Sequence, residues 1–267
     1  MSPRSGRVKA ARKLTRRSER VERGLFLAEG AKALTEALLV PGGVVEVFAT
    51  PAAGEEYAAL RKAVDDAGVP WLPATEDAVA SLSGARTPQG IVAVCRPLDV
   101  GLEVLLDRAA GDDGPVVVCA DVRDPGNAGT VIRCADAAGA RGVVLAGHSV
   151  DPYNDKTVRA TVGSLWHLPV VLVPDPAEAV ARLREAGHRV LAADGAGEVD
   201  LFAAEADGLL DGPVAWLFGN EAWGLPEELA AGADHRVSIP ILGRAESLNL
   251  STAAAVCLYA SARARQD

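Results

Sequence analysis

The chain has 267 residues, of which 49% are hydrophobic, 24% charged and 4% aromatic, and its formal net charge is −9. This composition excludes a disordered or collagen-like chain and predicts a folded protein of one large or two small domains. A negative net charge argues against a nucleic-acid partner only if the charge is evenly spread, because phosphate binding depends on clustered Lys and Arg.

The first 24 residues form a basic arm on an otherwise acidic chain. They hold nine basic and two acidic residues, a net +7, whereas the other 243 residues hold 18 basic and 34 acidic residues, a net −16. Such a segment is typical of a tail that binds anions, and equally of a solvated terminus. The residues that we expect to bind a substrate phosphate are Arg12, Lys13, Arg16 and Arg17.

The sequence predicts a cytoplasmic protein without a membrane anchor or a metal site. No apolar run approaches the roughly 20 residues of a membrane span, and the start lacks the apolar core of a secretory signal. The four cysteines and four histidines are scattered, without the spacing of metal ligands or of redox motifs. Unpaired cysteines fit a reducing compartment.

After the arm, strand and helix patterns alternate over residues 25–98, which predicts a small α/β domain. The strand patterns are at residues 24–30, 44–49, 71–72 and 90–95, and the helical patterns at 31–40, 55–67 and 75–82. Residues 99–114 are expected to be a linker, because residues 111–114 have turn composition.

Residues 115–267 are predicted to form a second, larger α/β domain. Apolar strand patterns at residues 115–120, 143–145, 170–173 and 189–193 alternate with helical patterns at 127–138, 155–163 and 176–186. Short connections between such elements imply a parallel sheet. Ligands bind at the carboxyl ends of the strands of such sheets, so the loops after these strands are the candidate functional segments.

Three of the loops carry an unusual set of polar residues. In the first, Asn127 follows a Pro-Gly pair as a predicted helix N-cap, and Arg133 lies two turns further on. In the second, Gly219 allows close approach of a ligand to the backbone, and Asn220 and Glu221 follow it. The third loop places more capping residues before the last helix than one helix can use, namely Ser247, Asn249, Ser251 and Thr252.

Together these loops resemble the SpoU family of RNA ribose 2'-O-methyltransferases, within the knotted SPOUT superfamily. The family pattern Asn-x-Gly-x-x-x-Arg stands at residues 127–133, Gly-Asn-Glu-x-x-Gly-Leu at 219–225, and Ile-Pro-x-x-Gly-x-x-x-Ser-Leu-Asn-x-Ser at 239–251. The resemblance runs from about residue 115 to the end and implies a parallel sheet with a trefoil knot. The segment that leads into residues 26–30 is similar to the small, ribosomal-protein-like substrate-binding domain of many of these enzymes.

The resemblance implies S-adenosylmethionine as the methyl donor and a homodimer as the working form. The residues that it assigns to the co-substrate are Leu217, Gly219, Asn220, Ile239 and Leu248. Those that it assigns to the active site are Asn127, Arg133, Glu221, Ser247 and Asn249. A guanidinium keeps its proton in proteins, so Arg133 is expected to bind a substrate phosphate, with a role as general base left open.

The sequence lacks the motifs of two other classes of enzyme. A dinucleotide-dependent dehydrogenase lacks its Gly-x-Gly-x-x-Gly turn, and a nucleotide hydrolase lacks its phosphate-binding loop. A non-catalytic RNA-binding protein on the same scaffold stays open. A large folded RNA suits the basic arm, so 23S ribosomal RNA is the expected substrate and transfer RNA the alternative.

Overall fold

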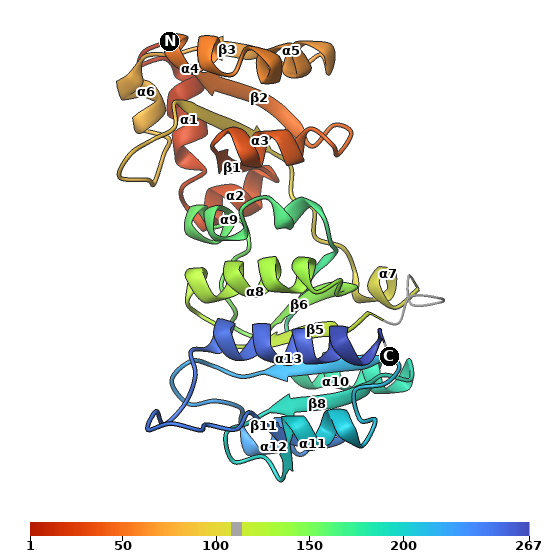
Figure 1. Cartoon of the computed structure of the whole chain (residues 1–267). Helices are drawn as coiled ribbons and strands as arrows, with labels where there is room; N and C mark the ends of the chain where they lie inside the picture. Colours follow the sequence, from red (N-terminus) through yellow and green to blue (C-terminus); the bar gives the residue numbers. More distant parts are fainter. Residues whose placement is uncertain (108–113, 267) are drawn as a thin grey trace. The chain divides into compact units, whose positions relative to one another are not determined.

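The computed structural model describes residues 1–107 and 114–266 (Figure 1). The chain folds into two compact units and passes between them three times. Unit 1 comprises residues 1–98 and 151–167, and unit 2 comprises residues 99–150 and 168–267. The sequence predicts a small domain at residues 25–98 and a larger one at residues 115–267. The units differ from this division because residues 151–167 belong to unit 1.

Unit 1 contains a mixed four-stranded sheet in the order β1-β4-β2-β3. β4 (Ile91–Cys95) is antiparallel to β1 (Phe26–Glu29) and to β2 (Val44–Ala49), and β2 is parallel to β3 (Trp71–Pro73). The helical elements are α1 (Gly6–Lys13), α2 (Arg17–Arg23), α3 (Ala31–Ala37), α4 (Pro51–Glu56), α5 (Ala58–Asp66), α6 (Glu76–Ala80), α9 (Asp155–Thr161) and the short η1 (Ser164–Trp166). The helix expected at residues 55–67 is present as α5, but it begins at Ala58, because Tyr57 separates it from α4, which ends at Glu56.

The basic arm is folded as α1 and α2 and is not a solvated tail. Val8, Ala11 and Leu14 recur at helical spacing and are buried in one cluster with side chains of β1, β2 and β4. Arg20 is itself buried, and it donates hydrogen bonds from Nε and Nη2 to Asp151 at 2.9 and 2.6 Å. The arm therefore contributes both to the core of unit 1 and to its charged surface.

Residues 151–167 complete the core of unit 1 although the sequence places them between two strands of unit 2. The ring of Phe26 on β1 lies 4.7 Å from that of Tyr153 and 6.2 Å from that of Trp166. Arg159 on α9 pairs with Glu29 at 3.4 Å. The helical pattern at 155–163 is confirmed as α9, but a periodic pattern does not specify which sheet a helix covers.

Unit 2 is built on a parallel seven-stranded sheet in the order β7-β6-β5-β10-β8-β11-β9, which confirms the expected parallel α/β fold. Its strands are β5 (Val116–Ala120), β6 (Gly142–Ala146), β7 (Val170–Val173), β8 (Arg189–Ala193), β9 (Val199–Asp200), β10 (Val214–Phe218) and β11 (His235–Ser238). Its helices are α7 (Leu102–Asp107), α8 (Pro125–Ala137), α10 (Pro176–Glu185), α11 (Leu201–Ala206), α12 (Glu227–Ala230) and α13 (Leu250–Ala264).

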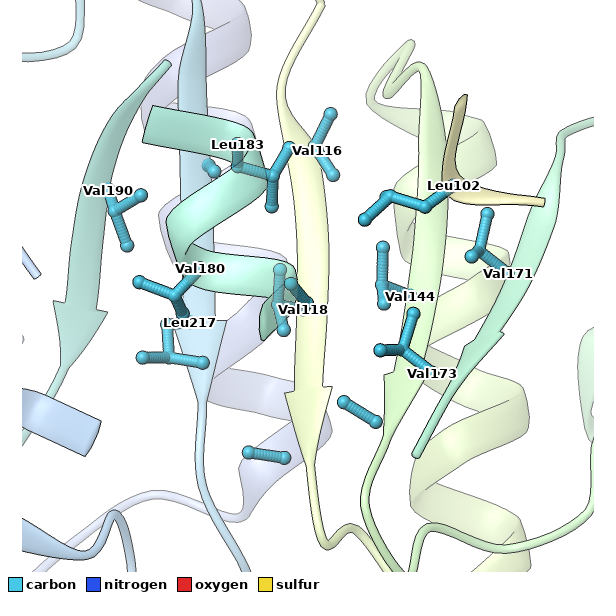
Figure 2. Close-up of a cluster of buried hydrophobic side chains, with 14 of the residues drawn as sticks. Leu102, Val116, Val118, Val144, Val171, Val173, Val180, Leu183, Val190 and Leu217 are labelled. Atoms are coloured by element: carbon cyan, nitrogen blue, oxygen red, sulfur yellow. The ribbon is translucent and has the colours of Figure 1, made fainter. Parts of the chain in front are cut away.

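The two faces of this sheet are covered by different helices. Figure 2 shows α10 lying over the strands of the sheet, with Val180 and Leu183 among buried side chains such as Val118 and Leu217. Successive side chains of a strand point to opposite faces, so Trp216 points away from α10, and its Nε1 donates to Ser261 of α13 at 2.8 Å. Part of the predicted linker belongs to this hydrophobic core, because Leu105 of α7 is fully buried. Its residues 108–113 lie outside the described residues.

The strand order creates a switch point between β5 and β10. The chain leaves β5 toward β6 and β7, whereas β10 is flanked on its other side by β8 and β11. Parallel sheets bind ligands outside the carboxyl ends of their strands at such a point. The loops that follow β5, β10 and β11 are the three that the sequence singles out.

Candidate active site

A cavity of about 450 Å³ lies where β8, β10 and β11 end. Seven of the predicted residues line it, namely Gly219, Asn220, Glu221, Ile239, Ser247, Leu248 and Asn249. Leu217 does not, since its side chain is fully buried in the cluster under α10. Asn127 and Arg133 lie on α8, outside the lining.

The loop after β10 is a closed, rigid turn. Asn220 and Gly224 exchange two backbone hydrogen bonds of 2.9 Å each, and the Asn220 side chain accepts a bond from the backbone N–H of Ala222 at 2.8 Å. Asn220 Nδ2 also donates to the backbone carbonyl of Asp121 at 2.7 Å. A side chain at Gly219 would collide with the backbone of Gly224, which explains why glycine stands there. The loop therefore presents a fixed backbone to the cavity.

Glu221 connects this turn to the loop after β5. Its Oε1 accepts hydrogen bonds from the backbone N–H of Asp124 at 3.0 Å and from Asn127 Nδ2 at 3.2 Å, and its Oε2 accepts one from the N–H of Arg123 at 3.2 Å. Partial burial raises the pKa of Glu221, but the hydrogen bonds to its ionised form outweigh burial, and the net pKa is lowered. Glu221 is therefore a carboxylate that orients its neighbours.

Asn249 joins the third loop to the same network. Its Nδ2 donates to Asn127 Oδ1 at 3.0 Å, while its Oδ1 caps α13 by accepting from the backbone N–H groups of Ser251 and Thr252 at 3.0 and 3.4 Å. One residue thus starts the last helix and fixes the amide of Asn127. Asn249 is one of the four capping residues that the sequence predicts before this helix, and its contact with Asn127 goes beyond capping.

The expectation that Asn127 caps α8 is wrong. The N-cap is Asp124, whose Oδ1 accepts from the backbone N–H of Asn127 at 2.8 Å. Pro125 occupies the first helical position, where its missing N–H leaves no donor unsatisfied, so the helix begins two residues earlier than expected. The shift frees the Asn127 side chain for Glu221 and Asn249.

The remaining predicted residues are exposed. Arg133 lies two turns into α8, about 120° around the helix from Asn127. In unit 1, Arg12, Arg16 and Arg17 form no ion pair within the part of the chain that the structure describes, whereas Lys13 lies 3.8 Å from Glu19. Three cationic side chains of the arm are therefore available to an anionic partner.

Sequence reasoning missed the part of Asp121 and Arg123 in this site. Asp121 has a φ of 56° and accepts a hydrogen bond from the backbone N–H of His148 at 2.7 Å through its side chain. The guanidinium of Arg123 lies over the indole of Trp223, 5.1 Å from the ring centroid. The available signal was position, since both residues directly follow a buried strand at the switch point.

Neither a metal centre nor a membrane span is found among the described residues. No group of three or more His, Cys, Asp or Glu side chains in residues 1–107 and 114–266 is placed to hold a metal ion. Over the same ranges, no helix has both the length and the apolar character needed to cross a bilayer.

Comparison with protein families identifies both parts of the chain. Residues 114–259 match the SpoU rRNA Methylase family. The chain belongs to this family. Residues 6–93 match the MRM3-like substrate binding domain. That match begins inside the basic arm, in agreement with the packing of α1 and α2 into unit 1.

The relatives of this SpoU methylase include one that aligns with nearly its whole length and one that aligns with about half of it. It is 33% identical over 261 residues to the Bacillus subtilis (strain 168) protein named 23S rRNA (guanosine(2553)-2'-O)-methyltransferase RlmP, covering 97% of this chain and 96% of that protein. It is 42% identical over 146 residues to a Streptomyces viridochromogenes 23S rRNA (uridine(2479)-2'-O)-methyltransferase, covering 53% and 50%.

Solved structures of similar proteins include AdoMet complexes. An AdoMet-bound rRNA methyltransferase from Sinorhizobium meliloti has a TM-score of 0.84 and 33% identity, covering 97% of this chain and 95% of that one. The SpoU methyltransferase AviRb from Streptomyces viridochromogenes, in complex with AdoMet, has a TM-score of 0.82 and 31% identity, covering 99% of both chains.

Proposed function

We propose that this protein transfers a methyl group from S-adenosylmethionine to a ribose 2'-hydroxyl of 23S ribosomal RNA. The observation that carries the proposal is the hydrogen-bonded series Glu221, Asn127 and Asn249, in which the three sequence motifs meet beside one cavity. Its support from outside the structure is the near full-length similarity to proteins named as 23S rRNA 2'-O-methyltransferases. We also propose that unit 2 contains the trefoil knot that the resemblance to the SPOUT superfamily implies.

The cavity suits S-adenosylmethionine in size and chemistry. Its volume of about 450 Å³ is within the range of small-molecule sites, and Ile239 and Leu248 supply apolar surface beside Gly219, which also lines the cavity. We assign Gly219, Ile239 and Leu248 to binding of this co-substrate. We assign Ser247 to binding of the ribose near the 2'-hydroxyl that is methylated. When bound, S-adenosylmethionine supplies an activated methyl group on a sulfonium.

The residues of the chain would orient the ribose. Glu221 and Asn249 fix both ends of the Asn127 amide. An amide group carries two N–H donors, and among the described contacts the network uses one from Asn127 and one from Asn249. The second donor of each is left for the RNA. A hydroxyl held in this way is placed for attack, which is the main requirement when the leaving group is already good.

Arg133 is proposed to bind a phosphate of the RNA. An exposed guanidinium on α8 offers a planar pair of donors to a phosphate. This role requires no loss of the arginine proton, so we prefer it to general-base catalysis.

Methyl transfer to transcribed 23S rRNA tests the function. We expect label from methyl-tritiated S-adenosylmethionine to enter the RNA at a position that then resists alkaline cleavage, because a 2'-O-methyl group blocks that reaction. Asn127→Ala should reduce the rate while calorimetric binding of S-adenosylmethionine persists. If the parent protein binds the co-substrate but labels no RNA, the non-catalytic RNA-binding interpretation replaces this one.

We further propose that the protein is a cytoplasmic homodimer. α13 packs against α8 and β10 but exposes Val256 and Tyr259, which are 36% and 56% exposed, and a second copy of the chain would cover them. Sedimentation equilibrium should give a dimer, and Tyr259→Glu a monomer. A dimer that persists in Tyr259→Glu would rule out this contact.

The cytoplasmic location is supported by the four free cysteines, which suit a reducing compartment. Fractionation of cells tests this location.

A further inference from the structure

Trp223 is an exposed aromatic side chain in the loop that forms the wall of the cavity. It is one of four tryptophans in the chain, and 54% of its surface is exposed, whereas Trp216 on the preceding strand is fully buried. With about half of its surface left in solvent, this ring gains only part of the stabilisation that full burial would give. Its position beside the site therefore calls for a functional explanation.

The loop fixes the backbone that carries this ring. Trp223 lies between Ala222 and Gly224, both of which are hydrogen-bonded to Asn220. Gly224 closes the turn with a φ of 69°, in the left-handed region that favours glycine. The indole is thus carried on a backbone that is ordered before any ligand arrives, which lowers the entropy lost when a ligand stacks on it.

Arg123 adds a cation to the ring. Its guanidinium lies 5.1 Å from the indole centroid, a cation–π geometry. Its backbone N–H donates to Glu221, the same carboxylate that binds Asn127. Glu221 therefore links the backbone of Arg123 to the Asn127 amide that we assign to the ribose.

We propose that Trp223, backed by Arg123, is a stacking platform for an unpaired base of the RNA, at or next to the nucleotide that is methylated. This inference rests on the proposed function. RNA-binding proteins recognise single-stranded nucleotides by stacking bases on aromatic rings and guanidinium planes. A ribose that reaches Asn127 brings its own base, or that of a neighbour, close to this loop.

An RNA base fits this surface better than another protein does. The core of a protein interface is mostly apolar and depleted of charged residues around such a ring. Trp223 instead has Arg123 over it, Glu221 two residues before it and Glu227 four residues after it. A flat aromatic base attached to a phosphate matches an isolated ring beside a cation.

Substitution of Trp223 by Phe, Leu and Ala separates stacking from apolar contact. With transcribed 23S rRNA as the probe, we expect Trp223→Ala and Trp223→Leu to raise the KM for RNA by about 10-fold to 100-fold, as stacking of one base is worth that much. Trp223→Phe should retain most of the affinity. The KM for S-adenosylmethionine and its calorimetric Kd should not change, which also shows that the cavity remains folded.

Phe202→Ala is the matched control. Phe202 on α11 belongs to the same unit and is 55% exposed, but it does not line the cavity, so its loss should leave the KM for RNA unchanged. If Trp223→Leu methylates RNA with the KM of the parent, the platform is disproved while the function stands. If the parent itself methylates no RNA, the proposed function fails first.

Fluorescence gives a second readout that a structural role would not produce. A short oligouridylate strand should quench the emission of the parent protein, and a duplex of oligoadenylate and oligouridylate should quench it less. Trp223→Phe keeps the other three tryptophans and should lose this difference. Equal quenching in Trp223→Phe and in the parent would contradict stacking on Trp223.

Discussion

Glu221 shows how one side chain can join segments that are about a hundred residues apart. Its carboxylate accepts three hydrogen bonds from the first loop, two from backbone N–H groups and one from Asn127. Glu221→Gln keeps the size of the side chain but turns one acceptor into a donor that faces other donors. A mispaired group of this kind costs about 1–3 kcal/mol.

We therefore expect Glu221→Gln to lower kcat about 10-fold to 100-fold, with little change in the KM for RNA. Because the pKa of Glu221 is lowered, its side chain is ionised at any pH at or above the ordinary pKa of a glutamate. The titration of Glu221 should therefore not affect the pH dependence of kcat near neutrality. Steady-state kinetics measures both effects, with Glu178→Gln on the exposed face of α10 as the control. An unchanged kcat would show that the network does not position the ribose.

Arg133→Lys distinguishes a planar pair of donors from a simple charge. Lysine keeps the positive charge but loses the fork that matches a phosphate. We expect kcat/KM for RNA to fall at least about 10-fold, as for the loss of a charge-assisted hydrogen bond of about 1.5–3 kcal/mol. A variant that methylates as fast as the parent would exclude both the phosphate contact and the general-base role.

His188 makes the stability of unit 2 sensitive to acid. It is buried at the start of β8, and burial lowers its pKa, assisted by the charge of Arg141, whose Nη1 lies 3.4 Å from Nε2. The opening beside it is also lined by Arg184, Glu185, Arg189, Asp234 and His235. The histidine is thus neutral in the folded state at pH values where the unfolded chain already binds a proton.

Since the unfolded state then holds more protons, stability should fall as the pH drops below the ordinary histidine pKa of about 6.5 toward the lower folded value. Urea unfolding at several pH values should show this loss in the parent and a smaller one in His188→Gln, which cannot titrate. Equal pH dependence in the two proteins would assign the effect to the other groups.

At the scale of elements, α1 and α2 carry both buried and exposed arginines, and we propose that the exposed ones bind RNA. Arg20 is buried, pairs with Asp151 at 2.6 Å and donates to the carbonyls of Leu14 and Thr15. Arg17, on the same helix, is exposed. Arg20→Ala leaves the partly buried Asp151 without its partner, whereas Arg17→Ala removes a solvated charge.

Breaking a fully buried pair costs about 3–5 kcal/mol. Because Asp151 is only partly buried, Arg20→Ala should lower the free energy of unfolding of unit 1 by at most about that amount. Arg17→Ala should leave stability within about 0.5 kcal/mol and weaken RNA binding instead. Thermal unfolding and RNA titration of the two variants measure this division. Equal melting temperatures would mean that the buried pair contributes nothing.

At the scale of the whole molecule, the net charge of −9 hides a basic arm of +7. Changing Arg12, Arg16 and Arg17 together to Gln should weaken RNA binding and reduce the slope of log affinity against log salt by roughly two to three. Binding of S-adenosylmethionine should not change. Substitution is the proper test, because deletion of the arm would remove Val8, Ala11 and Leu14 from the core of unit 1.

The control for this variant exchanges other charged residues on the surface. Changing Arg61 and Lys62 of α5 to Gln removes exposed charge outside the arm and should leave the salt slope unchanged. If the arm variant has the affinity and slope of the parent, the basic arm serves only the fold.

The sequence by itself determined the alternation of strands and helices, the parallel sheet of unit 2 and the three loops at its carboxyl edge. Local periods and turn residues are sufficient for these, because a buried strand and a helix cap each depend on a few neighbouring side chains. The tertiary structure decided that Asn127 contacts Asn249 and Glu221, that Arg20 is buried, and that residues 151–167 belong to unit 1. Each of these depends on which strands pair and on which sheet a helix covers, and no local period encodes a contact between residues a hundred positions apart.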